Sequence, residues 1–395
     1  MERILRLMSE KKASDVYLSA NSPALIKING QCVPINNQSL PNDATRNLLA
    51  EILPADRMAE LDAEGELNMG FPIAGVGRFR VSAMRQRGSY AAVIRYITTD
   101  IPPLHSLGVP EVLSSLIMEK RGLLLMVGST GAGKSTTLAA MMDYRNEKAT
   151  GHILTIEDPV EFLFKNKKSV VNQREVGRDC ETLQVALKNA LRQAPDCILI
   201  GEIRDRETMT AAISYALSGH LVLATLHANN SHHALGRILS FYTPEARPVL
   251  LGDLAAGLRA VISQRLLRAG DGGRVPAVEV LLNTNLVAEL IEKGDFTGVK
   301  EAMEKSMADG SCSFEEALAR MIGEGTISRE EGLAHSDSVT NLIWRLQNEA
   351  GPVSRATPRK IGEDDDVPEY TDFIIDVMPD GFVPRRGGGF PTLTA

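Results

Sequence analysis

The stretch Arg121-Gly-Leu-Leu-Leu-Met-Val-Gly-Ser-Thr-Gly-Ala-Gly-Lys-Ser-Thr136 runs from an apolar segment directly into a glycine-rich turn. Gly128, Gly133, Lys134 and Ser135 fill the pattern G-x-x-x-x-G-K-[ST], which is typical of a phosphate-binding loop. The glycines let the backbone curl so that successive N–H groups face a phosphate, and the positive end of the following helix adds to the attraction. The pattern predicts a nucleotide site formed by Gly128, Ser129, Thr130, Gly131, Ala132, Gly133, Lys134, Ser135 and Thr136.

The residues on both sides of this loop predict a strand followed by a helix. Residues 123–127 form a continuous apolar run, which suits a strand buried on both faces. Residues 136–147 read as a helix that ends before Gly151. In such a loop Lys134 would bridge the β- and γ-phosphates of ATP, and the Ser135 hydroxyl would bind Mg²⁺. Strand and helix patterns alternate after residue 111, so we expect an α/β core with a doubly wound parallel sheet.

Composition narrows the class of protein. The 395 residues carry a net charge of −7, which makes nucleic acid an unexpected partner because such binders usually have a basic surplus. The four cysteines show no C-x-x-C spacing, which argues against a zinc site and fits a reducing cytoplasm. Charged residues interrupt the N-terminus and no apolar run suits a membrane span. We therefore expect a soluble cytoplasmic protein that reaches a membrane only through partners.

The chain divides into four parts. Residues 1–100 read as a small α+β domain with a strand pattern at 15–19 and a hairpin over 25–33 around Asn29-Gly30. A helix is expected at 40–61, followed by a second strand pair at 78–84 and 90–97 around Arg87-Gly88-Ser89. Residues 101–111 have the proline and glycine density of a linker, and 112–350 hold the ATPase-type core. Residues 351–395 read as an acidic tail, either disordered or a binding segment.

Five arginines form a basic island in the first part. No acidic residue occurs between Glu66 and Asp100, where the arginines at 78, 80, 85, 87 and 95 all fall. A solvated hairpin face is one explanation. The other is a set of guanidiniums that meet phosphate, for which their planar forks are suited.

Acidic residues follow two predicted core strands. Residues 152–156 lead into Glu157-Asp158-Pro159-Val160-Glu161, and the apolar run 198–200 leads through Gly201 into Glu202. Ligands of parallel sheets bind at the carboxyl ends of the strands. Carboxylates there can hold magnesium or orient water. The second stretch has the form of a Walker B strand, but Gly201 stands where an aspartate is usual, so Glu202 must act there and Asp158 is expected to share the magnesium.

A third strand, residues 221–227, ends in His227, which we expect to hydrogen-bond near the γ-phosphate. His220, His227, His232 and His233 lie close in sequence; a metal cluster is the weaker alternative because cysteines and carboxylates in ligand register are lacking. Two helices are also predicted, over 179–193 with Asp179 as N-cap and over 248–268.

The order of these motifs resembles the secretion ATPases that drive type IV pili, specifically the retraction branch, PilT and PilU. The likeness covers residues 1 to about 340. Its carriers are Ala13-Ser-Asp-Val-Tyr-Leu-Ser-Ala20, Gly75-Val-Gly-Arg-Phe-Arg-Val81, the phosphate loop, Leu154-Thr-Ile-Glu-Asp-Pro-Val-Glu-Phe162, Val171-Asn-Gln-Arg-Glu175, Ile198-Leu-Ile-Gly-Glu-Ile-Arg-Asp205, Gly219-His-Leu-Val-Leu-Ala-Thr-Leu-His227 and Ile262-Ser-Gln-Arg-Leu266.

The resemblance implies a PAS-like N-terminal domain joined to a RecA-like ATPase domain, assembled as a hexameric ring at the cytoplasmic face of the inner-membrane pilus platform. By motif, Glu161 would polarise water, Glu202 would be the Walker B acid and His227 a sensor. Members of this family keep arginines in the region of Arg78, Arg80 and Arg95 that reach nucleotide across a domain or subunit boundary.

Two features favour the PilU branch, whose members would assist PilT in retraction. The stretch Leu286-Val-Ala-Glu-Leu-Ile-Glu292 lacks the arginines of the PilT motif A-I-R-N-L-I-R, and the chain carries an acidic C-terminal extension. Two other functions stay open. One is a nucleotide-binding adaptor that docks a PilT-like ATPase with little hydrolysis of its own, and the other is a nucleic-acid translocase, which the charge balance disfavours.

Overall fold

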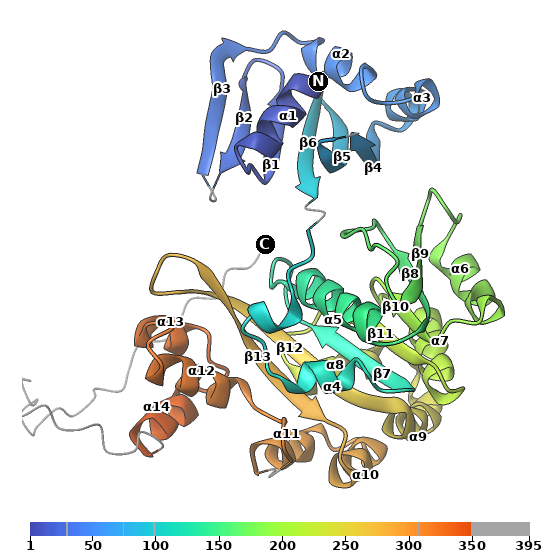
Figure 1. The fold of residues 1–395 in the computed structure, drawn as a ribbon, viewed down its shortest axis with the longest axis vertical. Helices are drawn as coiled ribbons and strands as arrows, with labels where there is room; N and C mark the ends of the chain where they lie inside the picture. Colours follow the sequence, from blue (N-terminus) through green and yellow to red (C-terminus); the bar gives the residue numbers. More distant parts are fainter. Residues whose placement is uncertain (29–30, 74, 98–99, 306–307, 349–395) are drawn as a thin grey trace, which may run out of the picture. The chain divides into compact units, whose positions relative to one another are not determined.

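The computed structural model describes residues 1–348 except 29–30, 74, 98–99 and 306–307. These residues build two sheets with separate cores (Figure 1). The predicted tail, residues 351–395, lies outside the described residues.

The first sheet is antiparallel and has the strand order β3-β2-β1-β6-β5-β4. Its apolar residues share one core with the helices, in which Phe79 is fully buried and stacks on Phe71 at 5.7 Å between ring centroids. The elements are α1 Glu2–Glu10, β1 Asp15–Ser19, β2 Pro23–Ile28, β3 Gln31–Ser39, α2 Ala44–Ala50, α3 Ala55–Glu64, β4 Glu66–Ile73, β5 Gly77–Gln86 and β6 Ser89–Ile97.

The predicted helix over 40–61 is wrong as a single element. Two helices, α2 and α3, replace it, because Pro54 lies between them with φ of −59° and ψ of 156°. A residue in that extended conformation cannot continue a helix. The β5–β6 hairpin is confirmed, and its turn carries Arg87 and Gly88 at positive φ.

The second sheet has the order β13-β12-β7-β11-β10-β8-β9. All neighbours are parallel except β12 and β13. The strands are β7 Gly122–Val127, β8 Gly151–Glu157, β9 Ser169–Glu175, β10 Cys197–Ile200, β11 Leu221–Leu226, β12 Leu258–Arg268 and β13 Arg274–Leu282. The expected α/β core with a largely parallel sheet is confirmed.

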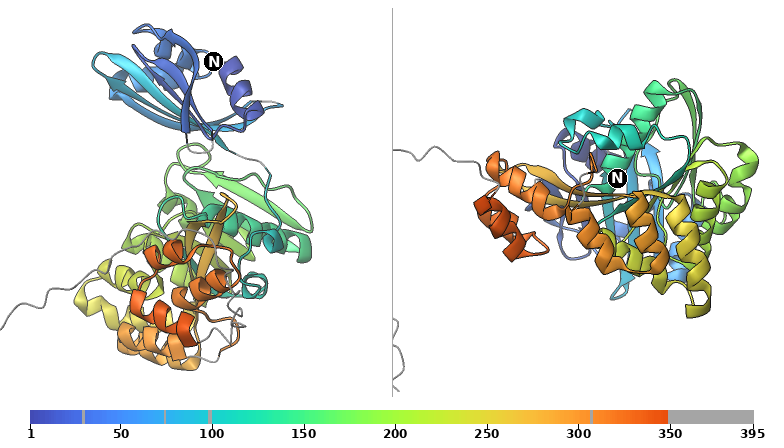
Figure 2. Two further views of the ribbon diagram at one scale, coloured as in Figure 1. Left: turned by 90° about the vertical axis from the view of Figure 1, so that its left-hand side faces the viewer. Right: turned by 90° about the horizontal axis from the view of Figure 1, so that it is seen from below.

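Helices cover both faces of this sheet, as the views in Figure 2 also show. Strand residues alternate between the two cores: Leu124 and Met126 of β7 pack with α4 and α5, whereas Leu123 and Leu125 pack with α6 to α11. The helices are α4 Val112–Leu116, α5 Lys134–Lys148, α6 Leu183–Ala190, α7 Arg206–Leu217, α8 Ser231–Ser240, α9 Arg247–Gly257, α10 Asn285–Lys293 and α11 Phe296–Lys305, with short 3₁₀ turns at Leu104–Ser106, Leu191–Gln193 and Pro244–Ala246.

Three further helices, α12 Phe314–Gly323, α13 Arg329–Ala334 and α14 Val339–Asn348, form a small core with Leu267 and Ala277 of the β12–β13 pair. Nowhere in the described part of the chain does a helix combine the length and apolarity needed to span a bilayer.

Two helix predictions in the core need correction. The segment 248–268 is helical only to Gly257, and its second half is β12, which pairs with β7 and is mostly buried. An apolar run buried on both faces does not show strand alternation, so periodicity alone could not separate the two structures. Helix α6 begins at Leu183 with Thr182 as its cap, while Asp179 accepts a hydrogen bond from the Glu175 N–H at 2.9 Å.

Candidate nucleotide site

The phosphate-loop residues connect β7 to α5 as the sequence predicts. Gly128, Gly131 and Gly133 have φ of 148°, 81° and 84°, values that favour glycine. Ser129, Thr130 and Ser135 are exposed, Thr136 is half-buried and Ala132 is buried. The loop therefore presents an open turn at the N-terminus of a 15-residue helix, which is a favourable place for an anion.

Lys134, the first residue of α5, folds back over its own loop. Its Nζ donates to the carbonyl oxygens of Gly128 and Ser129 at 2.7 and 2.8 Å. Burial lowers the pKa of Lys134, and the nearby charge of Glu202 opposes that shift. The ammonium is thus held by two neutral acceptors that a phosphate oxygen can replace.

Four charged or ionisable side chains meet at the carboxyl ends of β8, β10 and β11. Glu202 lies at the centre: its Oε1 is 3.1 Å from Nε2 of His227, and its Oε2 accepts from Nε and Nη2 of Arg204 at 2.8 and 2.7 Å. Asp158 Oδ2 lies 3.9 Å from Nη1 of the same arginine. The structure thus brings together Asp158, Glu202 and His227, which the sequence placed on three separate strand ends.

Gly201 has a structural reason to lack a side chain. A Cβ atom there would lie 3.2 Å from both the carbonyl oxygen of Ile156 and the Cα of Glu157. The hydroxyl of Thr225 on β11 donates to the Gly201 carbonyl oxygen. A side chain at this position would therefore require the β8 backbone to give way. Glu202 is the acidic side chain of this strand end.

Glu161 lies on the segment after β8, half-buried. Its N–H donates to Oε2 of Glu157 at 3.4 Å, and Thr155 donates to the other oxygen of Glu157 at 2.6 Å. Burial raises the pKa of Glu157. We interpret Glu157 as a support for this segment, on which Glu161 is presented.

The arginine island is divided among several environments. Arg78 is buried and forms an ion pair with Glu175 at the end of β9. Arg95 on β6 donates through Nε to Oδ1 of Asp15 at 2.8 Å, a bond that raises its pKa. Arg80 is half-buried and lies directly opposite Arg95 in the β5–β6 pair. Like charges directly opposite each other in a sheet are unfavourable, so this pairing suits an anion ligand.

The clustered histidines do not form a metal site: among residues 1–348, apart from the gaps stated above, no group of three His, Cys, Asp or Glu could hold a metal. His233 donates its backbone N–H to the side chain of Asn230, the N-cap of α8. His232 and His233 therefore belong to a helix start, as expected.

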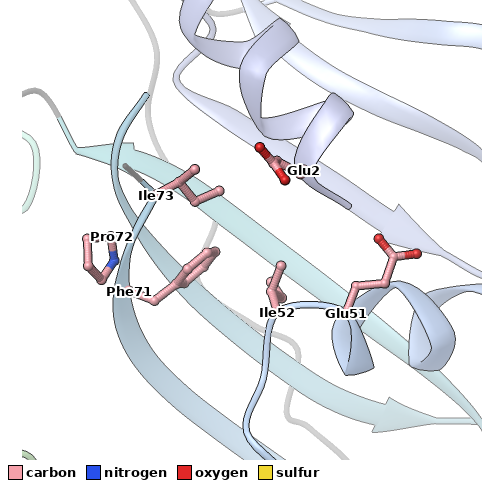
Figure 3. Close-up of a pocket in the computed structure, with 6 residues that line it drawn as sticks. All are labelled: Glu2, Glu51, Ile52, Phe71, Pro72 and Ile73. Carbon is pink, nitrogen blue, oxygen red and sulfur yellow. The ribbon is translucent and has the colours of Figure 1, made fainter. Parts of the chain in front are cut away.

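A separate hollow of about 310 Å³ lies on the N-terminal sheet domain (Figure 3). Two carboxylates face four apolar or proline residues around it: Glu2, Glu51, Ile52, Phe71, Pro72 and Ile73. None of the residues predicted from the sequence to bind nucleotide lines it.

Residues 3–331 match the protein family described as Type II/IV secretion system protein. The chain belongs to this family. It is similar to the type IV pilus ATPase PilU of Pseudomonas aeruginosa, with 44% identity over 356 residues that cover 90% of this chain and 93% of that protein. The type IV pilus retraction ATPase PilT of the same organism is 38% identical over 76% of this chain and 88% of its own length.

The same family relationship appears in solved structures. The crystal structure of the pilus retraction motor PilT with bound ADP matches with a TM-score of 0.80 and 36% identity, covering 86% of this chain and 99% of that chain. The Legionella pneumophila ATPase DotB matches with a TM-score of 0.73 and 28% identity, over 85% of this chain and 94% of that one. These matches confirm the secretion-ATPase resemblance and the two-part fold expected from the motifs.

Within this secretion ATPase, sequence reasoning missed two residues near the loop and the acidic strand ends. Arg204 was assigned no role from the sequence; its side chain is largely exposed, and its guanidinium binds Glu202. The signal available was its position two residues after the strand-end acid. Gln264 lies in the stretch Ile262–Leu266 that carries part of the family resemblance, and its side chain contacts the phosphate loop directly. Because the segment 248–268 was predicted to be helical, nothing in the sequence indicated that the Gln264 amide would be buried against the loop.

Proposed function

We propose that the chain is an ATP-hydrolysing motor subunit of the type IV pilus machinery that powers or assists pilus retraction. One observation carries the proposal: Lys134 lies on a phosphate loop whose neighbouring strand ends bring Glu202 and His227 within 3.1 Å of each other. The chain is also 44% identical to PilU, a type IV pilus ATPase.

The roles of the site residues follow from their chemistry. The loop amides of residues 128–136 bind the phosphates, and Lys134 leaves its two carbonyl acceptors to bridge the β- and γ-phosphates. Glu161 polarises the attacking water. Glu202 is the acid at the end of β10, and His227, hydrogen-bonded to it, senses whether the γ-phosphate is present.

The residues present fit Mg²⁺. Asp158 and Glu202 already share one cation, Arg204, so positive charge is favoured at this point. The Ser135 hydroxyl is exposed at the start of α5. Mg²⁺ in such sites takes one or two carboxylates plus phosphate oxygens and water, so it needs no cluster of three protein ligands. When bound, Mg²⁺ would neutralise phosphate charge, and Ser135, Asp158 and Glu202 would hold it directly or through water.

When subunits assemble into a ring, the arginines of the basic island complete the nucleotide site. Arg80 and Arg95 form a like-charge pair of which Asp15 neutralises one member, so one positive charge remains for an anion. These two arginines and Arg78, once released from Glu175, bind the phosphates of ATP. An arginine that stabilises the transferring phosphoryl group accelerates hydrolysis by about 10³ to 10⁵. Hydrolysis would thus depend on how the N-terminal domain approaches the nucleotide.

The assembly that fits this chemistry is a homo-hexamer in the cytoplasm, peripheral to the inner membrane through the pilus platform protein and acting with a PilT-like ATPase. Different affinities of the open and closed states for ATP and ADP convert hydrolysis into movement.

The test is steady-state ATP hydrolysis by the purified chain, with Lys134→Ala and Glu202→Ala as references. We expect wild-type turnover well above both variants, because each variant removes a group that acts on the phosphates. Turnover no faster than in either variant, with nucleotide still bound, would favour the adaptor function. Stimulation of hydrolysis by DNA would favour a translocase.

A further inference from the structure

Gln264 is a buried side chain packed against the phosphate loop. It lies on β12, the parallel neighbour of β7, and is 2% exposed. Its Nε2 donates to the carbonyl oxygen of Ala132 at 2.7 Å, and its Oε1 accepts from the hydroxyl of Thr137 at 2.8 Å. A single amide therefore ties the end of the loop to the first turn of α5.

The two glycines that define the loop pattern face this same residue. A Cβ atom at Gly133 would lie 2.7 Å from Nε2 of Gln264, and one at Gly128 would lie 2.5 Å from its carbonyl oxygen. Both glycines also have positive φ. The curvature of the phosphate loop is thus shaped around one residue of β12, at its backbone and at its side chain.

The direction of the Ala132 carbonyl matters for anion binding. A phosphate loop attracts an anion because its N–H groups face the ligand while its carbonyl oxygens point elsewhere. Gln264 provides the partner that holds the Ala132 oxygen in the protein interior. Without that donor, a buried carbonyl would lack a hydrogen bond, and a turn toward solvent or phosphate would be favoured.

We propose that Gln264 is a positioning residue of the nucleotide site, which holds the loop in its phosphate-binding conformation through Ala132 and Thr137 and so sets the affinity for nucleotide. The inference rests on the proposed function, in which this loop binds the phosphates of ATP. Gln264 itself need not touch the nucleotide.

The adjacent residue Ser263 offers a matched control. It is fully buried on the same strand, and its hydroxyl donates to Oε1 of Glu279 at 3.0 Å. Neighbouring strand residues point to opposite faces of a sheet, so Ser263 is directed away from the loop that Gln264 contacts. Ser263→Ala removes one buried hydrogen bond from β12 without touching the loop.

The experiment measures the dissociation constant of the full-length protein for ADP, with a fluorescent ADP analogue, together with the thermal unfolding midpoint without nucleotide. Gln264→Met keeps the side-chain length but removes both hydrogen bonds, and we expect a dissociation constant raised about tenfold. Ser263→Ala should lower the unfolding midpoint about as much as Gln264→Met does, since each removes buried hydrogen bonds from β12. It should leave the dissociation constant for ADP within about twofold of the wild-type value, because sites without shared partners act independently.

Thr137→Val tests the same contact from the other side, and it decides the matter if Gln264→Met does not fold. As a single substitution, Thr137→Val should weaken ADP binding. In the double variant with Gln264→Met, it should cause no further loss of affinity. Wild-type affinity in Gln264→Met or Thr137→Val, or equal weakening in Ser263→Ala, would overturn the inference. If the wild-type protein binds no better than Lys134→Ala, the proposed function fails instead.

Discussion

We expect Arg204 to compete with a metal ion for Glu202, and Arg204→Gln tests this competition. In the structure the guanidinium places two N–H groups on one carboxylate oxygen of Glu202 and lies 3.9 Å from Asp158. A cation that binds these carboxylates must displace the guanidinium or share them with it. Glutamine at this position removes the competing charge while keeping a polar side chain.

The size of the effect follows from burial. The side chain of Arg204 is 64% exposed and that of Glu202 is 23% exposed, so solvent screens the pair on one side only. Exposed ion pairs contribute about 0.2–1 kcal/mol, and hydrogen bonds to charged groups about 1.5–3 kcal/mol when buried. Because only one partner is largely exposed, we assign the Arg204–Glu202 pair about 1 kcal/mol, the upper end of the range for exposed pairs. This free energy corresponds to a factor of about five in a binding constant.

The assay is a magnesium titration of ATP binding at fixed nucleotide concentration. We expect the Mg²⁺ concentration at half-saturation to fall about fivefold in Arg204→Gln, and the difference to shrink at high salt because screening weakens the competing pair. Arg206→Gln is the matched control, since it removes the same charge two residues later, where the guanidinium stacks 5.3 Å from the Tyr242 ring. That variant should titrate like the wild type.

An unchanged midpoint in Arg204→Gln would refute the competition, because the ion pair would then cost metal binding nothing. A higher midpoint would show that Arg204 helps to bind the nucleotide rather than opposing the metal. An equal shift in Arg206→Gln would mean that overall charge, and not the contact with Glu202, governs the titration.

Two further predictions concern ring function and stability. Arg80→Ala or Arg95→Ala should lower ATP turnover while the N-terminal domain stays folded. Mixing either variant with Glu202→Ala subunits should restore part of the activity if the contact is made between subunits, and unchanged turnover in both variants would mean that the pair only faces solvent. Glu279→Gln should be more stable than the wild type at pH 8, with a difference that shrinks as the pH falls toward the ordinary carboxyl pKa of 4.5. Burial raises the pKa of Glu279 in the folded protein. The neutral carboxyl therefore stabilises the wild type fully below pH 4.5, and this stability is lost as the pH rises through the folded pKa. Glutamine cannot ionise, and it keeps the oxygen that accepts from the Ser231 N–H. Parallel unfolding curves for the two proteins from pH 4 to 8 would contradict this.

Local patterns were sufficient to predict the phosphate loop and its flanking elements. A buried apolar strand, glycines at positive φ and a helix start are neighbours in sequence, so the residues from Gly128 to Lys134 contain the information that shapes them. The three strand ends with Asp158, Glu202 and His227 were also predictable, because parallel strands in one sheet end at the same edge.

What the sequence by itself determined is therefore the chemistry of the loop and the identity of the strand-end groups. The tertiary structure alone decided which of these groups touch. Arg204 reaches Glu202 because of the path of the chain after β10, and Gln264 reaches the loop because β12 pairs with β7 across a long sequence separation. An apolar run buried on both faces has no polar alternation that would identify it as a strand or indicate which strand it pairs with. Only the assembled sheet shows that β12 is a strand and that it supports the nucleotide site.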